Sequence, residues 1–579
     1  MSSADTTTPP STKPRSAKAL AARVAALEAA LAAAHGQVAE LTRERDTLRA
    51  SYERLRLDLE LLQRRIVIAK AERVDTAQLE LEFAAKLAAL DALSAELDGG
   101  AGAAAPTPAG DTPGSPARKK PVGRRDLRQA NLPEERVEID DPIFEEQVAR
   151  GEAQRIGFEE SYKLAWQRGG LRRLVVARVK YRVPGEVPET TLLSTAPMPA
   201  ETFARSLAAP SLLARIIVEK YLDGMPLHRQ EDRFARDGVR LDRGTMCRWV
   251  EDAGATAGAT VILAARNEAM HTAFCIATDA TGVLVQPLRT EQTRQPCRRG
   301  HYLVQIADRD HVFFEYLPRE TGAAIGELFK GFSGYVQADA KSVYDTLFRP
   351  PEAKPPDDDA DLATCSEVGC WSHARRKFWE ATVAKSVVAR EGLARMGRLF
   401  ALERKWKGRP VVEVKALRAQ FARPHLDALF TWAEAEHKTV LGERSLLRTA
   451  LGYLVRQKDA LMRYLDDGRL VMDNNRSERE LRRVAVGRKA WLFVGSDDHA
   501  QSAAHLFSLV ASARLHGLDP EAYLRDLFRV LAHWPRDRFL ELSPRYWAST
   551  RSRLDARELA AEIGRLTIPD PLPPTTEEK

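Results

Sequence analysis

The sequence predicts a multidomain α+β protein, and three observations support that prediction. The chain has 579 residues, more than one hydrophobic core usually organises, so several domains are expected. An apolar heptad pattern near the N-terminus predicts a long helix, and alternating apolar and polar residues in the middle of the chain predict strands. Residues 373–466 read as helical almost throughout.

Composition fits a soluble protein in a reducing compartment. Hydrophobic residues make up 44% of the chain and charged residues 29%, and no apolar stretch is long enough to cross a bilayer, so we expect no membrane partner. The N-terminus lacks the apolar region of a secretory signal, and the five cysteines are few and odd in number, which favours the cytoplasm. A net charge of +7 does not by itself indicate a nucleic-acid binder.

The N-terminal helix carries a coiled-coil pattern. Apolar residues recur from Leu20 to Ile66 with alternating steps of four and three, with Arg45 at one core position. A helix over this stretch is about 70 Å long at 1.5 Å per residue. So narrow an apolar stripe requires a partner helix, and we expect a homo-oligomer formed through this region. A hairpin with the helix-like residues 76–97 of the same chain is the alternative.

A linker and a small β-rich module follow. Residues 99–126 are rich in Gly, Ala and Pro and predict a flexible linker, whose basic end from Arg118 to Arg125 is either a solubilising segment or a contact to DNA phosphate. In LVVARVKYRV the alternation predicts a half-buried strand with a basic outer face. The apolar face carries Ala177, Val179, Tyr181 and Val183, and the basic face carries Arg178, Lys180 and Arg182.

The next region predicts three helices. Two helical patterns end at glycines, and Asp242 is a suitable N-cap for a third helix that has Arg243, Thr245 and Arg248 near its start. This arrangement resembles a helix-turn-helix unit, in which these three residues would contact DNA. Many helical bundles share the pattern.

The sequence from residue 258 onward predicts the order strand, strand, strand, helix, strand. Asp279 and Asp339 come at the ends of the first and fourth of these strands. If the two strands are neighbours, the two carboxylates lie close together, and a divalent cation relieves their repulsion. Carboxylate oxygens suit Mg²⁺, and two such ions activate an attacking oxygen and stabilise a leaving one in phosphoryl transfer. A structural reading as turn-forming aspartates stays open.

The segment from Met472 to Ser496 supplies a third carboxylate. Asp473 or Asn475 would cap a helix with Glu478 in its first turn and Arg482 four residues further on. Capping explains Glu478 without catalysis, but it does not explain the surrounding cations. A metal–phosphate site does, and it makes DNA-binding candidates of Arg482, Arg488 and Lys489, together with the basic helix face of Arg375, Arg376 and Lys377.

Several segments in a fixed order resemble the transposases of the insertion sequence 66 family, over roughly residues 120–535. The matching segments are KYLDGMPLHRQEDRFARDGVRLDRGTMCRWV, ATDATGVLV around Asp279, GYVQADAKSVYD around Asp339, GCWSHARRKFWE, DNNRSERELRRVAVGRKAWLFVGS around Glu478, and AHLFSLVASARLHGLDPEAYL. The resemblance implies a ribonuclease-H-like α/β catalytic core interrupted by a helical insertion, with Asp279, Asp339 and Glu478 as a catalytic, metal-binding triad.

The same resemblance implies cofactors and partners. It implies Mg²⁺ or Mn²⁺, as two ions, and DNA in the form of terminal inverted repeats and target DNA. It also implies accessory proteins of the same element and a bacterial, nucleoid-associated location. The function expected is DNA strand cleavage followed by strand transfer. The alternatives are a catalytically silent DNA-binding protein derived from a transposase and a Mg²⁺-dependent nuclease without strand transfer.

Zinc is not expected. Family members usually carry a zinc module built from two Cys pairs, but the corresponding residues 131–198 contain no cysteine. Cys365, Cys370 and His373 offer three ligands without an obvious fourth, and their role stays open.

The expected domains are a disordered tail (1–16), coiled-coil helices (17–98), a basic linker (99–130), the β-rich module (131–198), the helix-turn-helix-like region (199–257), the first part of the core (258–352), the helical insertion (353–470), the third-carboxylate part of the core (471–500), a C-terminal helical segment (501–545) and a tail (546–579).

Overall fold

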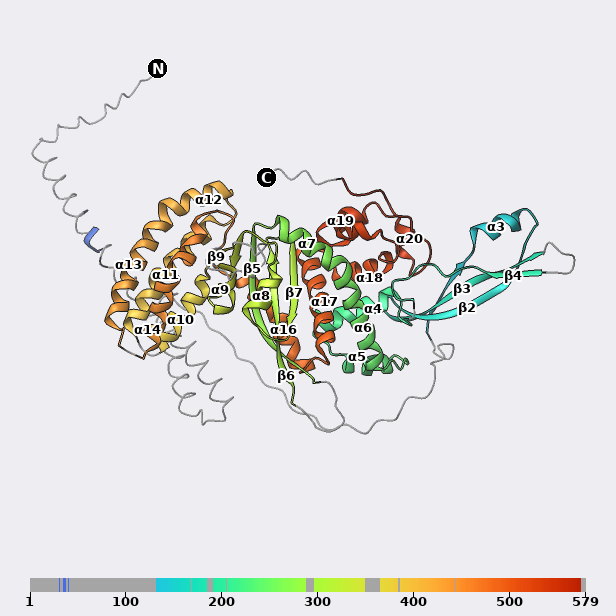
Figure 1. Cartoon of the computed structure of the whole chain (residues 1–579), viewed down its shortest axis with the longest axis horizontal. Coiled ribbons are helices and arrows are strands. Elements are labelled where there is room, and N and C mark those ends of the chain that lie inside the picture. Colours follow the sequence, from blue (N-terminus) through green and yellow to red (C-terminus); the bar gives the residue numbers. More distant parts are fainter. Residues whose placement is uncertain are drawn as a thin grey trace, which may run out of the picture. The chain divides into compact units, whose positions relative to one another are not determined.

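The computed structural model describes residues 31, 35–37 and 40, and then residues 132–573 except 168, 185–190, 205, 288–295, 349–364, 384–385 and 443. The chain divides into two compact units, residues 1–121 and 122–579, and the elements of the second are labelled in Figure 1. Nearly all of the predicted coiled coil, together with the N-terminal tail and the basic linker, lies outside the described residues.

The β-rich module is one sheet with a helix packed on it. Its elements are β1 (Glu134–Ile139), α3 (Pro142–Ala149), β2 (Gln154–Gln167), β3 (Gly170–Pro184) and β4 (Thr191–Thr195), with β3 pairing all three other strands. Ala177, Val179 and Tyr181 of β3 are buried, as the alternation predicted. The Tyr181 hydroxyl donates to Glu145 (2.7 Å) and accepts from the Asp141 N–H (2.8 Å), which fixes α3 to the sheet. An apolar cluster therefore holds the module together.

Three helices follow at the predicted places. They are α4 (Pro210–Tyr221), α5 (Leu227–Arg236) and α6 (Arg243–Ala257), and the π-helical turn η2 (Gly258–Ile262) leads from α6 into α7 (Leu263–Thr272). Gly224 and Gly238 follow α4 and α5 with φ of 71° and 82°, a backbone conformation that glycine adopts easily. The Asp242 side chain caps α6 by accepting from the backbone N–H groups of Gly244 and Thr245.

A five-stranded sheet forms the centre of this unit, in the order β7-β6-β5-β8-β9. Its elements are β5 (Cys275–Val285), β6 (Arg298–Ala307), β7 (His311–Leu317), α8 (Gly322–Leu328), β8 (Tyr335–Gln337) and β9 (Ser366–Val368). Strands β5, β6 and β7 are antiparallel neighbours, whereas β8 runs parallel to both β5 and β9. The range 353–470 expected for the insertion therefore includes one strand of the sheet.

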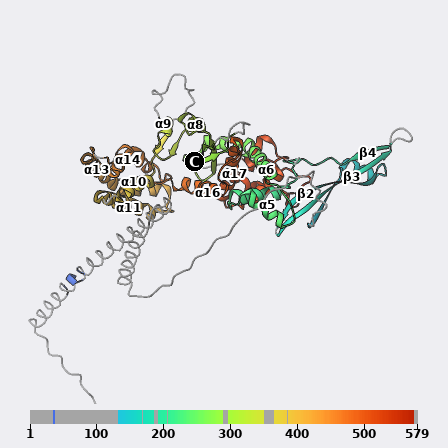
Figure 2. The same ribbon diagram turned by 90° about the horizontal axis from the view of Figure 1, so that it is seen from below.

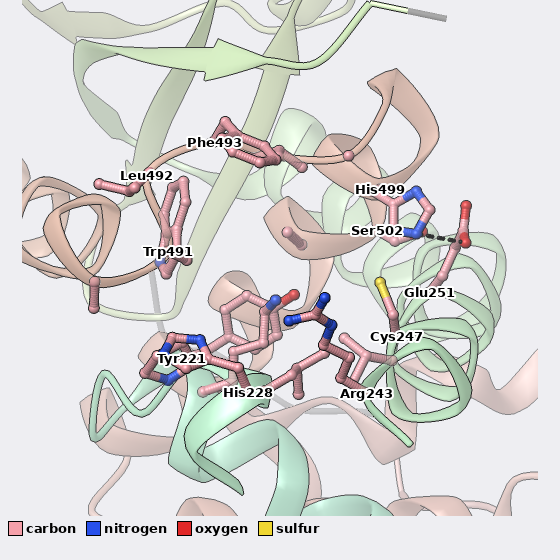
Figure 3. Close-up of a pocket in the computed structure, with 18 of the residues that line it drawn as sticks. Tyr221, His228, Arg243, Cys247, Glu251, Trp491, Leu492, Phe493, His499 and Ser502 are labelled. Atoms are coloured by element: carbon pink, nitrogen blue, oxygen red, sulfur yellow. Dashed lines mark ion pairs between the residues drawn. The ribbon is translucent and has the colours of Figure 1, made fainter. Parts of the chain in front are cut away.

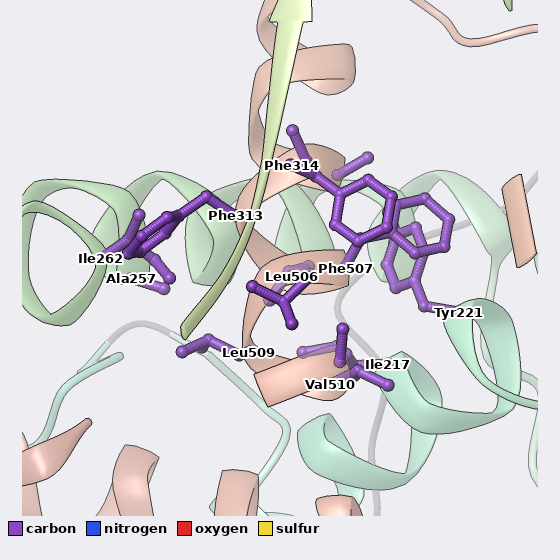
Figure 4. Close-up of a cluster of buried hydrophobic side chains, with 14 of the residues drawn as sticks. Ile217, Tyr221, Ala257, Ile262, Phe313, Phe314, Leu506, Phe507, Leu509 and Val510 are labelled. Carbon is purple, nitrogen blue, oxygen red and sulfur yellow. The ribbon is translucent and has the colours of Figure 1, made fainter. Parts of the chain in front are cut away.

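Helices α16 (Asn475–Trp491) and α17 (Asp497–Leu515) complete this core. Helix α17 packs on β7, where Ser512 and Ser508 accept hydrogen bonds from the Val312 and Phe314 N–H groups. Figure 4 shows aromatic and aliphatic side chains of α4, β7 and α17 meeting around Phe507. The remaining C-terminal elements are α18 (Pro520–Val530), η7 (Arg536–Leu542), α19 (Pro544–Arg551) and α20 (Ala556–Ala560).

The helical insertion between β9 and α16 has a hydrophobic core of its own. Its elements are α10 (Trp371–Val383), α11 (Val387–Trp406), α12 (Val411–Leu417), η5 (Arg418–Ala422), α13 (Arg423–Thr439), α14 (Leu446–Arg456), α15 (Lys458–Met462) and η6 (Arg463–Leu465). Two short elements, η3 (Ser342–Tyr344) and α9 (Asp345–Phe348), lie between β8 and β9. Helices α10, α11, α13 and α14 pack together, as both views show (Figures 1 and 2). Within the described residues, no helix combines the length and apolarity needed to cross a bilayer.

Candidate functional site

Asp279 and Asp339 lie next to each other because their strands are neighbours. Strand β8 pairs in parallel with β5 up to Gln337 opposite Ala277, and each aspartate comes two residues later. The same offset places both on the same face. Asp279 lies inside β5 rather than at the predicted strand end, because β6 pairs with β5 as far as Val285.

The electrostatics of the pair show this proximity. Burial raises the pKa of the Asp279 carboxyl above its ordinary value, and the charge of Asp339 raises it further. The Ala280 N–H, which donates to Asp279 Oδ1 at 2.7 Å, opposes the shift. The Oδ1 atom of Asp339 is buried and has no hydrogen-bond partner among the described residues. The pair therefore places two carboxylates close together, and one of their oxygens, Asp339 Oδ1, is available to a ligand.

Lys341 and Glu320 extend the site beyond the residues that the sequence suggested. Lys341 Nζ lies 3.5 Å from Asp339 Oδ2 and 3.5 Å from Glu320 Oε1. Burial alone would lower the pKa of Lys341, but the charges of Asp339, Glu320 and Asp279 raise it above its ordinary value. Lys341 therefore stays charged beside the carboxylates. Its position two residues after Asp339 was the available sequence signal.

Glu478 is presented from the first turn of α16, with 42% of its side chain exposed. The N-cap of this helix is Asn474, not Asp473 or Asn475 as predicted. The Asn474 side chain does not cap the helix because it is used elsewhere: its Nδ2 donates to the Thr278 carbonyl at 2.7 Å, and its Oδ1 accepts from Ser477 at 2.7 Å. This buried amide holds the start of α16 against β5, one residue before Asp279.

Cys370 and His373 connect α10 to the same place. The Asn474 N–H donates to Cys370 Sγ at 3.2 Å, and His373 Nε2 lies 3.7 Å from Glu478 Oε1. The charge of His373 also acts on Asp279, whose pKa it lowers. Cys365 instead donates its thiol to the Phe332 carbonyl at 3.7 Å. The three residues considered as zinc ligands therefore make separate contacts, and two of them serve the carboxylate site.

Asp279 and Asp339 fit a hard divalent cation, since they offer paired carboxylate oxygens, one of them buried and unpartnered. In the part of the chain that the structure describes, no three His, Cys, Asp or Glu side chains form one closed metal-binding group. The structure thus brings the two aspartates together, and His373, whose charge acts on Asp279, connects them to Glu478. The expected convergence of all three carboxylates on one point is not present in this conformation.

The predicted DNA contacts fall into two groups. Arg482, Lys489, Arg243, Arg248 and Arg375 have exposed side chains. The others have contacts within the protein: Arg488 donates to the Gly282 carbonyl and to the Thr281 hydroxyl, Arg376 pairs with Glu380, Lys377 lies over the Tyr453 ring, and Thr245 lies 3.3 Å from Arg248. Arg488 therefore ties α16 to β5, a role that its sequence position does not reveal.

Two cavities along α16 are strongly basic. One, of about 340 Å³, is lined by Lys220, Arg479, Arg482, Arg483 and Arg514 among others. The next, of about 320 Å³, shares Arg479, Arg483 and Arg514 and adds Arg476 and Glu480, which pairs with Arg483 at 3.0 Å. We call this the basic channel. Arginine and lysine side chains are the groups that proteins use to hold phosphates. Arg514 comes from α17, which the sequence did not suggest.

Replacing Asn474 by Ala is expected to lower any activity of the carboxylate site by about 10- to 100-fold, the usual effect of losing a group that orients a ligand. The bond from Asn474 Nδ2 to the Thr278 carbonyl is lost, so Glu478 is no longer held at a fixed place relative to Asp279. Asn475→Ala is the matched control, because Asn475 is exposed on the same helix. Equal initial rates for the two variants would contradict the role of Asn474 in positioning Glu478.

Comparison with known proteins places the chain among mobile-element proteins. The family model described as Transposase IS66 family matches residues 205–502, and the model for the IS66 C-terminal element matches residues 508–544. Three similar proteins of Sinorhizobium fredii (strain NBRC 101917 / NGR234) carry the names uncharacterized protein y4qI, y4hP and y4jD. The first is 28% identical over 91% of this chain and 95% of its own length.

The other two relatives match over shorter stretches. The protein y4hP is 28% identical over 61% of this chain and 65% of its own length, and y4jD is 29% identical over 57% and 64%. The names of the relatives assign no activity. The family models together cover more than half of the chain, including the helices before the central sheet, the sheet itself, the insertion and α16. The chain belongs to the IS66 family of transposases.

Proposed function

We propose that this protein is a DNA transposase that binds the ends of a mobile element and catalyses metal-dependent strand cleavage and strand transfer. The observation that carries the proposal is the Asp279–Asp339 pair on neighbouring parallel strands, with Glu478 on a helix anchored to the same strand. Membership of a transposase family supports the reaction class. The basic channel supports a polyanionic substrate.

We assign the central sheet to the ribonuclease-H-like fold. From one edge of the sheet to the other, the strands are the third, second, first, fourth and fifth of the sheet along the chain. The first three are antiparallel neighbours, and the fourth and fifth run parallel to the first. The helical insertion enters after β9 and returns the chain at α16. This connectivity explains how Glu478, 139 residues after Asp339, comes back to the sheet.

Asp279, Asp339 and Glu478 would hold Mg²⁺ or Mn²⁺, as two ions. When bound, such ions activate water and stabilise the leaving oxygen of an in-line displacement. Residues of the chain have three further roles in this proposal. Lys341 balances the charge of the aspartates, and Asn474 keeps α16 in place. Arg479, Arg482 and Arg483 hold DNA phosphates. Water attacks the phosphodiester and releases a 3′-hydroxyl, which then attacks a phosphodiester of target DNA and expels its 3′-oxygen.

DNA recognition would involve regions outside the carboxylate site. We propose that α4, α5 and α6 act as a helix-turn-helix unit for the terminal inverted repeats, with Arg243, Thr245 and Arg248 at the start of α6. Arg375, Arg376 and Lys377 on α10 and Lys489 on α16 would contact flanking or target DNA. The coiled coil predicted for residues 17–98 would pair protomers, and accessory proteins of the same element would join the complex.

The experiment is a cleavage and joining assay with the full-length chain and a plasmid that carries the inverted repeats flanking its gene. We expect nicks at the element ends in Mg²⁺ and joined products with target DNA, and neither in EDTA. Cleavage without joined products would identify a nuclease. End binding without cleavage would identify a catalytically silent DNA-binding protein. Either result would overturn the proposal.

A further inference from the structure

A third cavity, of about 350 Å³, lies at the far end of α16 from Glu478. Aromatic and aliphatic side chains form most of its wall, among them Tyr221, Leu227, Trp491, Phe493 and Phe507. Figure 3 shows the Trp491 ring pointing from α16 toward Tyr221, with Phe493 on the loop that follows. We call this the aromatic cavity. Its volume lies at the lower end of the range of sites that bind small organic molecules.

The rim of the aromatic cavity is held in a strained turn. Leu492 ends α16 with φ of 65°, a conformation that costs a β-carbon-bearing residue about 1–3 kcal/mol and that concentrates at functional sites. Leu492 is 64% exposed and Phe493 is 43% exposed. Directly after them, Val494 bonds back to β5: its N–H donates to the Leu284 carbonyl, and its carbonyl accepts from Gln286, both at 2.8 Å. The rim is thus fixed from both sides while its apolar side chains stay accessible.

Trp491 carries a polar group that has no partner. Among the described residues, no acceptor lies within hydrogen-bond distance of its buried Nε1–H. The indole lies over Gly487, where an added Cβ would come within 2.8 Å of Nε1, so the missing side chain at Gly487 makes room for the ring. A buried donor without an acceptor is unfavourable. An acceptor atom at the edge of the ring would satisfy it, and this contact is separate from stacking on the ring face.

One lysine and three aromatic residues connect this cavity to the basic channel. Lys220, Tyr221, Trp491 and Phe507 line both the aromatic cavity and the channel, so the two are adjacent. Arg243 and His228 add further basic groups to the aromatic cavity. Glu251, the acidic residue in its wall, is paired with His499 at 2.9 Å (Figure 3). The surroundings therefore favour an occupant that carries negative charge on one side and an aromatic ring on the other.

A nucleotide has this chemistry. Aromatic side chains stack on the face of any base, and basic side chains hold the phosphates of the strand. Inside a duplex both faces of a base are covered by its neighbours, so an enclosed cavity admits only a base that has left the stack. Trp491 follows Glu478 by 13 residues of one helix, about 20 Å at 1.5 Å per residue. That length equals roughly six nucleotides at 3.4 Å per step.

We propose that the aromatic cavity binds one unpaired base of a DNA strand whose phosphates lie in the basic channel, roughly six nucleotides from the cut. This inference rests on the proposed action on DNA, and it adds that the strand is held unpaired at this point. Trp491 and Phe493 would stack on the base, and Lys220 would contact the adjoining phosphate.

The test measures binding in EDTA, so that cleavage plays no part. The probes are a duplex with one unpaired 2-aminopurine, the same duplex with an abasic site in place of that base, and the fully paired duplex. For the full-length chain we expect a change in 2-aminopurine fluorescence on binding and an affinity at least about fivefold higher for the unpaired base than for the abasic site. Equal affinities for these two probes would overturn the inference.

The variants are Trp491→Ala, Phe493→Ala and Trp491→Phe, with Leu284→Ala as control because Leu284 is a half-exposed apolar residue of β5 that does not line the cavity. The two alanine variants should lose the preference for the unpaired base, whereas Trp491→Phe and Leu284→Ala should keep it. Affinity for the fully paired duplex should stay the same in all four. If the wild-type chain does not bind the fully paired duplex, the result counts against the proposed function. If both alanine variants keep the preference for the unpaired base, the result counts against the aromatic cavity alone.

Discussion

Replacing Asp339 by Asn is expected to lower the rate of DNA strand cleavage by more than about 100-fold. Mutating a group that only orients a metal ligand lowers activity by about 10- to 100-fold, and losing a ligand itself should lower it further. The amide keeps the shape of the side chain but removes the negative charge that a divalent cation needs. The fold should tolerate the change, since removing the charge of Asp339 relieves Asp279, whose pKa it raises, and the contact weakened is a 3.5 Å ion pair with Lys341, whose side chain is 41% exposed. Activity and stability are therefore expected to separate.

The measurement compares single-turnover cleavage, end binding and thermal unfolding of the variant with those of wild type. Asp279→Asn and Glu478→Gln should behave alike, while Asp345→Asn, an exposed carboxylate six residues after Asp339, should stay at the wild-type rate. Wild-type cleavage by any one of the three variants would break the triad assignment. A large drop in unfolding temperature for Asp339→Asn would show that the carboxylate serves the fold.

The sequence predicted the strands and the neighbouring aspartates because alternation and strand order are local signals. The alternation placed Tyr181 and Val179 on a buried face. The positions of Asp279 and Asp339 in their strands predicted that they would meet if the two strands were neighbours, and the structure pairs β5 with β8. Strand length was less predictable. Asp279 lies inside β5 because a partner strand, β6, continues past it, and pairing with a distant strand leaves no mark in the local sequence.

The contacts around Glu478 depend on residues far apart in the chain. His373 precedes Glu478 by 105 residues, and Asn474 follows Thr278 by 196, so no spacing rule predicts either contact. The sequence left the role of Cys370 and His373 open, because the same residue types serve as metal ligands and as hydrogen-bond partners. Helix α16 continues to Trp491, and the bridge of Val494 to Val285 of β5 after it is another contact between residues far apart in the chain.

Replacing Arg418 is expected to have a large effect on stability. Its side chain is 3% exposed, and it donates to both Glu403 oxygens, at 2.9 and 2.7 Å. It also donates to the carbonyls of Tyr464, Asp467 and Leu470, at 2.7–2.9 Å. Replacing it by Met keeps the apolar volume but leaves a partly buried carboxylate and three carbonyls without a donor. Breaking a buried pair in this way costs about 3–5 kcal/mol of unfolding free energy.

The loss should be measured as the shift in the urea midpoint of tryptophan fluorescence, since Trp371 and Trp406 lie in the core of the insertion. Arg409→Met is the matched control: Arg409 pairs with Glu413 one helical turn away, both side chains are exposed, and about 0.5 kcal/mol or less is expected. Arg418→Lys should stay close to Arg418→Met, because one ammonium cannot reach the five acceptors that the planar guanidinium serves. Equal midpoints for Arg418→Met and Arg409→Met would contradict the argument.

This buried arginine also bears on the carboxylate site. The carbonyls that it binds belong to residues 464–470, and the chain then runs directly to Met472, whose carbonyl accepts from the Trp371 N–H at 2.9 Å, and to Asn474 at the start of α16. Freeing residues 464–470 should therefore loosen the anchor of Glu478 before the insertion unfolds. Cleavage by Arg418→Met is expected to fall at urea concentrations well below its unfolding midpoint, whereas wild type and Arg409→Met should lose cleavage only as they unfold. Parallel loss of cleavage and structure in all three would show that the insertion and the site are not coupled through this segment.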